Sequence, residues 1–71
     1  MKIEDIVLKY SLLNAKQYGK AREDAVIKKV LAEVPEAKKE IKLLFEVVKK
    51  IVSEVNSLSK EEIEKRILEL G

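Results

Sequence analysis

The stretch Val55-Asn56-Ser57-Leu58-Ser59-Lys60-Glu61-Glu62 marks the end of one long predicted helix and the start of a short one. Ser59 and Glu62 have the spacing of a capping box, in which the Ser59 hydroxyl accepts a hydrogen bond from the N–H of residue 62 and the Glu62 carboxylate accepts one from the N–H of Ser59. Asn56 and Ser57 interrupt the preceding apolar rhythm with side chains that compete for backbone hydrogen bonds. The junction therefore predicts two helices joined by a short turn.

Upstream of this junction, the longest predicted helix covers about residues 35–56 and carries a continuous apolar stripe. At about 100° per residue, the members of the stripe fall within about 100° of arc. They are Ala37, Ile41, Leu44, Val48, Ile51, Val52 and Val55. Pro35 suits the first position of a helix and disfavours helical geometry in the residue before it, so we expect the helix to begin there. This third helix would be the spine of the fold.

Three further amphipathic segments are predicted as helices, at about residues 3–17, 22–33 and 60–70. Gly19 is the natural end of the first, because glycine accepts the left-handed conformation that follows many helix ends. The positions expected to face the core are Ile3, Ile6, Val7, Tyr10 and Leu13, then Ala25, Val26, Val30 and Leu31, and finally Ile63, Ile67, Leu68 and Leu70. No segment alternates with a period of two, and short connections favour antiparallel neighbours. The prediction is one all-α domain over residues 1–71, a compact bundle of four helices.

The composition argues against several classes of function. The 71 residues contain no cysteine and no histidine, so disulfides, thiolate chemistry and the commonest metal ligand and acid–base group are missing. Gly19 and Gly71 are the only glycines, too few for a glycine-rich phosphate loop. We expect no catalytic site, no metal site and no cofactor in this chain. We also expect no membrane segment, because the apolar runs are only a few residues long. The expected location is the cytoplasm.

Lysine residues give the clearest sign of a binding surface. On a helix over residues 35–56, Lys38, Lys42 and Lys49 would fall along one line, with Lys39 and Lys50 about 80–100° further round and all five away from the apolar stripe. Residues 16–50 hold ten basic and six acidic side chains, a local balance of +4. Two interpretations remain open: a face that contacts RNA phosphates, or a solvated helix face with ordinary i,i+4 pairs, which is the commoner arrangement.

Apolar residues on the outer side of the same helix predict a second candidate surface. Leu43 and Val47 lie away from the stripe, and they either widen the core or join Phe45 in a docking patch for another protein. Asn14 lies close to the apolar line of the first helix. We expect its side chain to bind backbone groups near the turn at Gly19.

Four stretches of the chain carry a family resemblance. They are Leu8-Lys9-Tyr10-Ser11-Leu12-Leu13-Asn14-Ala15, Gly19-Lys20-Ala21, Ala25-Val26-Ile27-Lys28-Lys29-Val30-Leu31-Ala32-Glu33 and Val55-Asn56-Ser57-Leu58-Ser59. In this order and at this spacing they resemble the N-terminal extension of archaeal-type glutamyl-tRNA synthetases. The chain departs from that family where a lone Gly19 replaces a double glycine, where Arg22-Glu23-Asp24 replaces an Asn-Pro-Gly-like turn, and where a glycine near Lys28 is absent. These changes raise helix propensity, which indicates a divergent or redesigned member.

The resemblance implies a function by analogy. Synthetases of this kind join glutamate to its tRNA with ATP and magnesium, on a nucleotide-binding fold whose motifs are absent from these residues. The chain would then be a non-catalytic N-terminal domain that helps to dock tRNA, through the five lysines, or a partner protein such as the catalytic body of the synthetase. The alternative is a stand-alone or engineered helical module for protein–protein interaction or structure, with Leu43, Phe45 and Val47 as its contacts.

Overall fold

The computed structural model describes residues 3–70, which form four α-helices and one short 3-10 helix. Their bounds are α1 Ile3–Tyr18, α2 Glu23–Glu33, the 3-10 helix η1 Pro35–Glu40, α3 Ile41–Asn56 and α4 Lys60–Leu70. No strand occurs within these residues, so the all-α prediction is confirmed, and α1, α2 and α4 agree with their predicted bounds to within one residue. None of the described helices is both long and apolar enough to cross a membrane.

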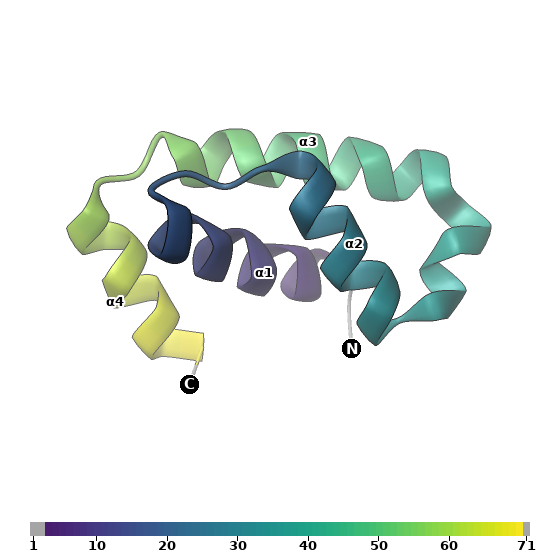
Figure 1. Ribbon diagram of the computed structural model, residues 1–71, viewed down its shortest axis with the longest axis horizontal. Helices are drawn as coiled ribbons and strands as arrows, with labels where there is room; N and C mark the ends of the chain where they lie inside the picture. Colours follow the sequence, from purple (N-terminus) through teal and green to yellow (C-terminus); the bar gives the residue numbers. More distant parts are fainter. Residues whose placement is uncertain (1–2, 71) are drawn as a thin grey trace.

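The helices pack around α1, in a body of 35 × 21 × 16 Å. Figure 1 shows α3 running along the long axis with α1 beside it, α2 near the end where α3 begins, and α4 at the opposite end. α1 contacts all three other α-helices, whereas α4 packs chiefly on α1. The third helix therefore spans the molecule as expected, but the centre of the packing is α1.

The core is aliphatic and lies mainly between α1 and α3. The stripe predicted for the third helix is confirmed, since its seven members are all buried or half-buried. The fully buried side chains of the core include Ile6, Val7, Leu12, Val26, Val30, Val48 and Val55.

Three positions expected in the core are exposed. Leu13 is 40% exposed, and its neighbours Ser11 and Leu12 are buried instead. The reason is that α2, α3 and α4 all pack on α1, so the buried part of its surface is wider than the predicted stripe and does not coincide with it. Leu68 is 81% exposed and Leu70 is 46% exposed, because α4 packs chiefly on α1 and buries only the side of Ile63.

The start of the predicted 35–56 helix is wrong. Residues 35–40 form η1, and Glu40, with φ −120° and ψ 48°, separates it from α3. Pro35 begins η1 as expected for a helix start, and Ala37 is buried. A 3-10 helix has three residues per turn, and the backbone leaves helical geometry at Glu40, so side chains on η1 do not continue the rows of α3.

The turn between α3 and α4 forms half of the predicted capping box. The N–H of Glu62 donates to Ser59 Oγ at 3.2 Å, which caps the start of α4. The reciprocal half is not formed among the described residues: the Glu62 carboxylate accepts a hydrogen bond from Arg66 Nε at 3.2 Å, one turn along α4. Ser57 Oγ donates to the carbonyl oxygen of Glu54 at 2.6 Å, the local competition that ends α3.

Candidate functional site

The outer face of α3 carries three of the five lysines singled out in the sequence. Lys42 and Lys49 are exposed and lie about 20° apart around the helix axis, and Lys50 is exposed about 80–100° from them. Glu46 lies on the same face. None of the ion pairs found between residues 3 and 70 involves these lysines. Their ammonium groups are therefore available to an anionic partner.

Lys38 and Lys39 do not extend this face in one line. Both are exposed, but they belong to η1, and the non-helical backbone at Glu40 lies between them and α3. The single line expected for Lys38, Lys42 and Lys49 is wrong, because it assumed one continuous α-helix. The structure instead provides two separate cationic groups, one on each side of Glu40.

The apolar residues predicted as a docking patch also divide into two groups. Leu43 is 53% exposed, Phe45 is 49% exposed, and Val47 is half-buried against the core. Leu43 and Phe45 lie about 160° apart around α3, whereas Leu43 and Val47 lie about 40° apart. The sequence left open whether Leu43 and Val47 widen the core or form a docking patch. Val47 is partly in the core, whereas Leu43 is not. Phe45 lies about 40–60° from the two lysines Lys42 and Lys49, so it adjoins the cationic face.

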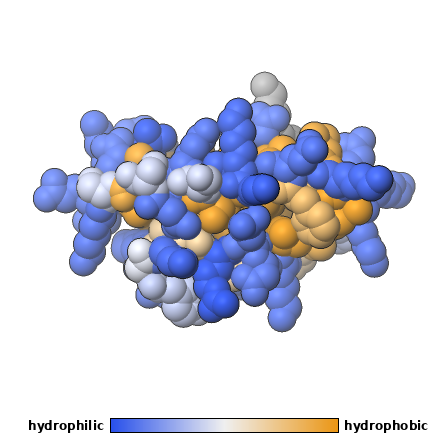
Figure 2. Space-filling model, turned by 90° about the horizontal axis from the view of Figure 1, so that it is seen from above, coloured by the Kyte–Doolittle hydropathy of each residue, from blue (hydrophilic) through white to orange (hydrophobic). Residues whose placement is uncertain are grey.

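Leu43 borders an apolar groove where the start of α1, η1 and α3 meet. The groove has a volume of about 270 Å³ and is lined by Ile3, Val34, Glu36, Ala37, Lys39, Glu40, Leu43 and Leu44. Figure 2, which looks down on the molecule from the side of α3, shows apolar side chains gathered at the end where α3 begins, among hydrophilic ones. We call this feature the Leu43 groove.

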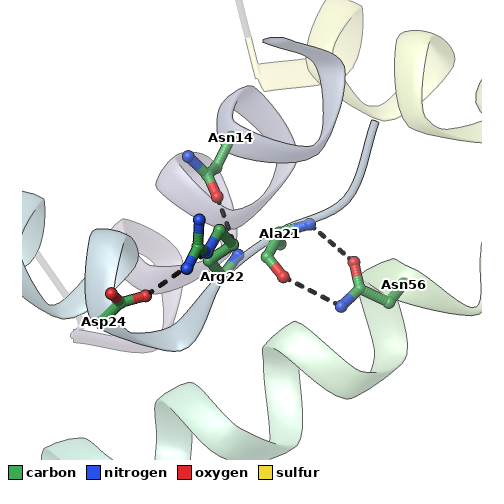
Figure 3. A network of polar contacts seen from close by, with 5 residues as sticks. All are labelled: Asn14, Ala21, Arg22, Asp24 and Asn56. Carbon is green, nitrogen blue, oxygen red and sulfur yellow. Dashed lines mark hydrogen bonds and ion pairs between the residues drawn. The ribbon is translucent and has the colours of Figure 1, made fainter. Parts of the chain in front are cut away.

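The loop between α1 and α2 is held by two side-chain amides (Figure 3). Asn56 Oδ1 accepts a hydrogen bond from the N–H of Ala21 at 2.7 Å, and Asn56 Nδ2 donates to the carbonyl oxygen of Ala21 at 3.0 Å. Asn14 Oδ1 accepts from the N–H of Arg22 at 2.8 Å, which confirms the expected role of Asn14. Gly19 has φ +84°, the left-handed conformation predicted at the end of α1. The loop is thus fixed to α1 and to the end of α3 at once.

The sequence did not predict the contact made by Asn56. It indicated only that Asn56 ends the apolar rhythm of the third helix. The one available signal is its position directly after Val55, which is buried and so brings the helix end against the rest of the molecule. The contact joins two of the stretches that carry the family resemblance, Gly19-Lys20-Ala21 and Val55-Asn56-Ser57-Leu58-Ser59.

A second polar contact fastens the end of α2 to α1. Tyr10 donates its hydroxyl proton to Glu33 Oε1 at 2.5 Å, and Lys9 Nζ lies 3.9 Å from the same oxygen and 5.2 Å from the centre of the Tyr10 ring. The hydrogen bond to Glu33, with smaller contributions from burial and from the negative charge of Glu33, raises the pKa of Tyr10 above its ordinary value. The hydroxyl therefore remains a donor throughout the neutral range.

Over nearly its whole length the chain is similar to part of several glutamate–tRNA ligases. It is 46% identical over 71 residues to that of Pyrococcus furiosus and 49% identical over 69 residues to that of Thermococcus kodakarensis, covering 99% and 96% of this chain. It is 50% identical over 60 residues to that of Thermofilum pendens, covering 83% of this chain.

The chain spans only 10–12% of the length of these relatives. No family model matches it. No solved structure matches it either. The resemblance found in the sequence is confirmed as one to a small helical part of glutamate–tRNA ligases.

Proposed function

We propose that this chain is a helical domain of a glutamate–tRNA ligase, at its N-terminal side, and that it assists the docking of tRNA without taking part in the chemistry. Similarity at 46–49% identity over nearly all of the chain supports the parent enzyme. The short span within those relatives supports an accessory role, since the chain corresponds to about an eighth of their length. Joining glutamate to tRNA, with its ATP and magnesium, would belong to the remainder of the ligase in the cytoplasm.

The observation that carries RNA docking is the outer face of α3. Lys42 and Lys49 are exposed, share one side of the helix and take part in none of the ion pairs found within the described chain. Lysines arranged in this way contact phosphates and position a nucleic acid without reading its sequence. Phe45 adjoins them and offers an exposed ring to the same partner.

Charge reversal on this face tests the proposal. The double variant Lys42→Glu/Lys49→Glu should weaken tRNA binding by about tenfold or more at low salt. It should also flatten the dependence of log Kd on log salt concentration by about 1.8, since each lost phosphate contact removes about 0.9. The measurement is fluorescence anisotropy with labelled tRNA over a salt series.

A matched control keeps the net charge the same. The double variant Lys60→Glu/Lys65→Glu reverses two exposed lysines on α4 instead, and it should lose much less affinity. Equal losses in both variants would show only non-specific attraction, and an unchanged affinity in Lys42→Glu/Lys49→Glu would remove the α3 face from the proposal.

The Leu43 groove favours a second candidate function, the docking of a protein partner such as the body of the ligase. Leu43 is 53% exposed beside a groove with several aliphatic walls, an arrangement that suits an apolar side chain of a partner. Leu43→Ser should abolish complex formation with the ligase body in sedimentation experiments and leave tRNA binding by the free chain unchanged. Self-association of the parent chain with rising concentration, lost in Leu43→Ser, would instead indicate a homo-oligomeric contact.

A further inference from the structure

The surface between α1 and α2 contains a second cationic feature that is separate from the α3 face. One hollow of about 560 Å³ is lined by Asn14, Tyr18, Lys20, Arg22, Asp24 and Ala25. A smaller hollow of about 170 Å³ adjoins it, shares Asn14 and Ala25, and adds Tyr10, Gln17 and Lys29. The two hollows are neighbours on this surface, and we call them together the α1–α2 groove.

The cations at its mouth are held in place by the loop contacts described above. Ala21 is 2% exposed, and both its N–H and its carbonyl oxygen are hydrogen-bonded to the side chain of Asn56. Arg22 has extended geometry, with φ −119° and ψ 130°. Lys20 and Arg22 lie on either side of buried Ala21 in the chain. Both are exposed. The backbone that carries them is therefore held in place before any ligand arrives.

The other groups of the groove suit a ligand with planar bases. Tyr18 is 65% exposed, which leaves its ring open for stacking. Asn14 uses Oδ1 for the N–H of Arg22, and within residues 3–70 its Nδ2 has no hydrogen-bond partner and is left to donate to an acceptor in the groove. The one carboxylate in the wall is Asp24, which lies 3.9 Å from Arg22 Nε, so the groove keeps a positive balance from Lys20 and Lys29.

We propose that the α1–α2 groove binds an unpaired segment of RNA, with phosphates at Lys20 and Arg22 and a base stacked on Tyr18. The charge of the wall selects a polyanion, and the exposed ring selects one whose bases are free to stack. An A-form duplex does not offer base faces to a side chain, whereas loops and single-stranded ends do. The inference rests on the proposed function, because it takes RNA as the partner and adds a second surface to the α3 face.

Binding of a short single-stranded RNA, compared with a duplex of equal length, tests the inference. Tyr18→Ala should weaken single-strand binding by about tenfold, the usual effect of losing one stacked base, and should leave duplex binding within about twofold. Tyr18→Phe keeps the ring and should bind like the parent. Tyr18 is largely exposed, so neither substitution should alter the thermal unfolding curve.

The electrostatic part of the inference is tested by Lys20→Glu/Arg22→Glu. This variant should bind the single strand at least tenfold more weakly and flatten its salt dependence by about 1.4, at about 0.7 per phosphate contact on a single strand. The control is again Lys60→Glu/Lys65→Glu on α4. Equal losses in the two double variants, or unchanged single-strand binding in Tyr18→Ala, would overturn the inference.

The outcomes separate the two proposals. If the parent chain binds no RNA at low salt, both fail. If Lys42→Glu/Lys49→Glu weakens tRNA binding but Tyr18→Ala does not weaken single-strand binding, the α3 face stands and the groove does not bind RNA. Displacement of the single strand by poly-glutamate at equal charge concentration would assign the groove to acidic peptides and overturn the inference.

Discussion

At the scale of single residues, Asn56 links the sequence resemblance to the architecture. Its side-chain amide makes both hydrogen bonds available on the backbone of Ala21, as a neighbouring strand would. Because two hydrogen bonds join the same two residues, the contact fixes the orientation of the Ala21 backbone as well as its distance from Asn56. The same contact holds the backbone between the exposed residues Lys20 and Arg22, which line the α1–α2 groove.

Replacement of Asn56 by alanine should destabilise the protein by about 1–3 kcal/mol, because the part-buried N–H and carbonyl of Ala21 would lose their partners. Urea unfolding followed by circular dichroism gives the change in the free energy of unfolding. Gln17→Ala removes an exposed amide from α1 and should stay within about 0.5 kcal/mol of the parent. An Asn56→Ala variant as stable as Gln17→Ala would contradict the role given to this contact.

At the scale of the elements, α3 presents three different sides. Its inner side carries the buried stripe, one flank presents Phe45 beside Lys42 and Lys49, and the other presents Leu43 to the groove with η1. Because each residue turns the helix by about 100°, neighbouring positions in the sequence lie on different sides of α3. The division explains how one helix can hold the core together and still offer two distinct surfaces.

The inner side of α3 is tested by Val48→Asp. Val48 is 0% exposed, so the substitution buries an unpaired carboxylate at a cost of roughly 4 kcal/mol or more, comparable with the whole stability of about 4–10 kcal/mol expected for 71 residues. The variant should lack a cooperative melt in circular dichroism. Glu46→Asp, which places the same side chain on the outer face, should melt near the parent, and a parent-like melt for Val48→Asp would contradict the assigned phase of α3.

The elements that depend on local pattern could be predicted from the sequence, and those that depend on packing could not. The stripe from Ala37 to Val55, the end of α1 at Gly19 and the cap at Ser59 follow from residue spacing and backbone preference. The 3-10 geometry of η1 was missed, because Pro35 is an equally good first residue for either kind of helix.

The candidate sites show the same limit. The outward direction of the lysines on α3 was predicted correctly, because it follows from the phase of the stripe. Leu43 and Phe45, which the sequence analysis groups as one contact, lie on different flanks of α3, because pointing away from the core does not place two residues on one side of a helix. The hydrogen bonds between Asn56 and Ala21 join residues 35 positions apart, and nothing in the local sequence pairs them.

At the scale of the whole molecule, α1 organises the packing and α3 and the α1–α2 loop present the candidate contacts. α1 touches each of the other α-helices, and the loop that follows it is fastened to the far end of α3. The α3 face and the α1–α2 groove would engage RNA, and the Leu43 groove would remain for a protein partner. A domain with separate surfaces for RNA and protein could position tRNA against the body of a ligase.

The most direct test of this account is a titration of isotope-labelled protein with glutamate tRNA, followed by backbone amide chemical shifts at low and moderate salt. We expect localised shifts in residues 42–50 of α3 and residues 18–22 of the loop, weaker at the higher salt because phosphate contacts release counterions. Shifts in neither segment at either salt concentration would contradict RNA docking and would leave the Leu43 groove, with a protein partner, as the functional surface.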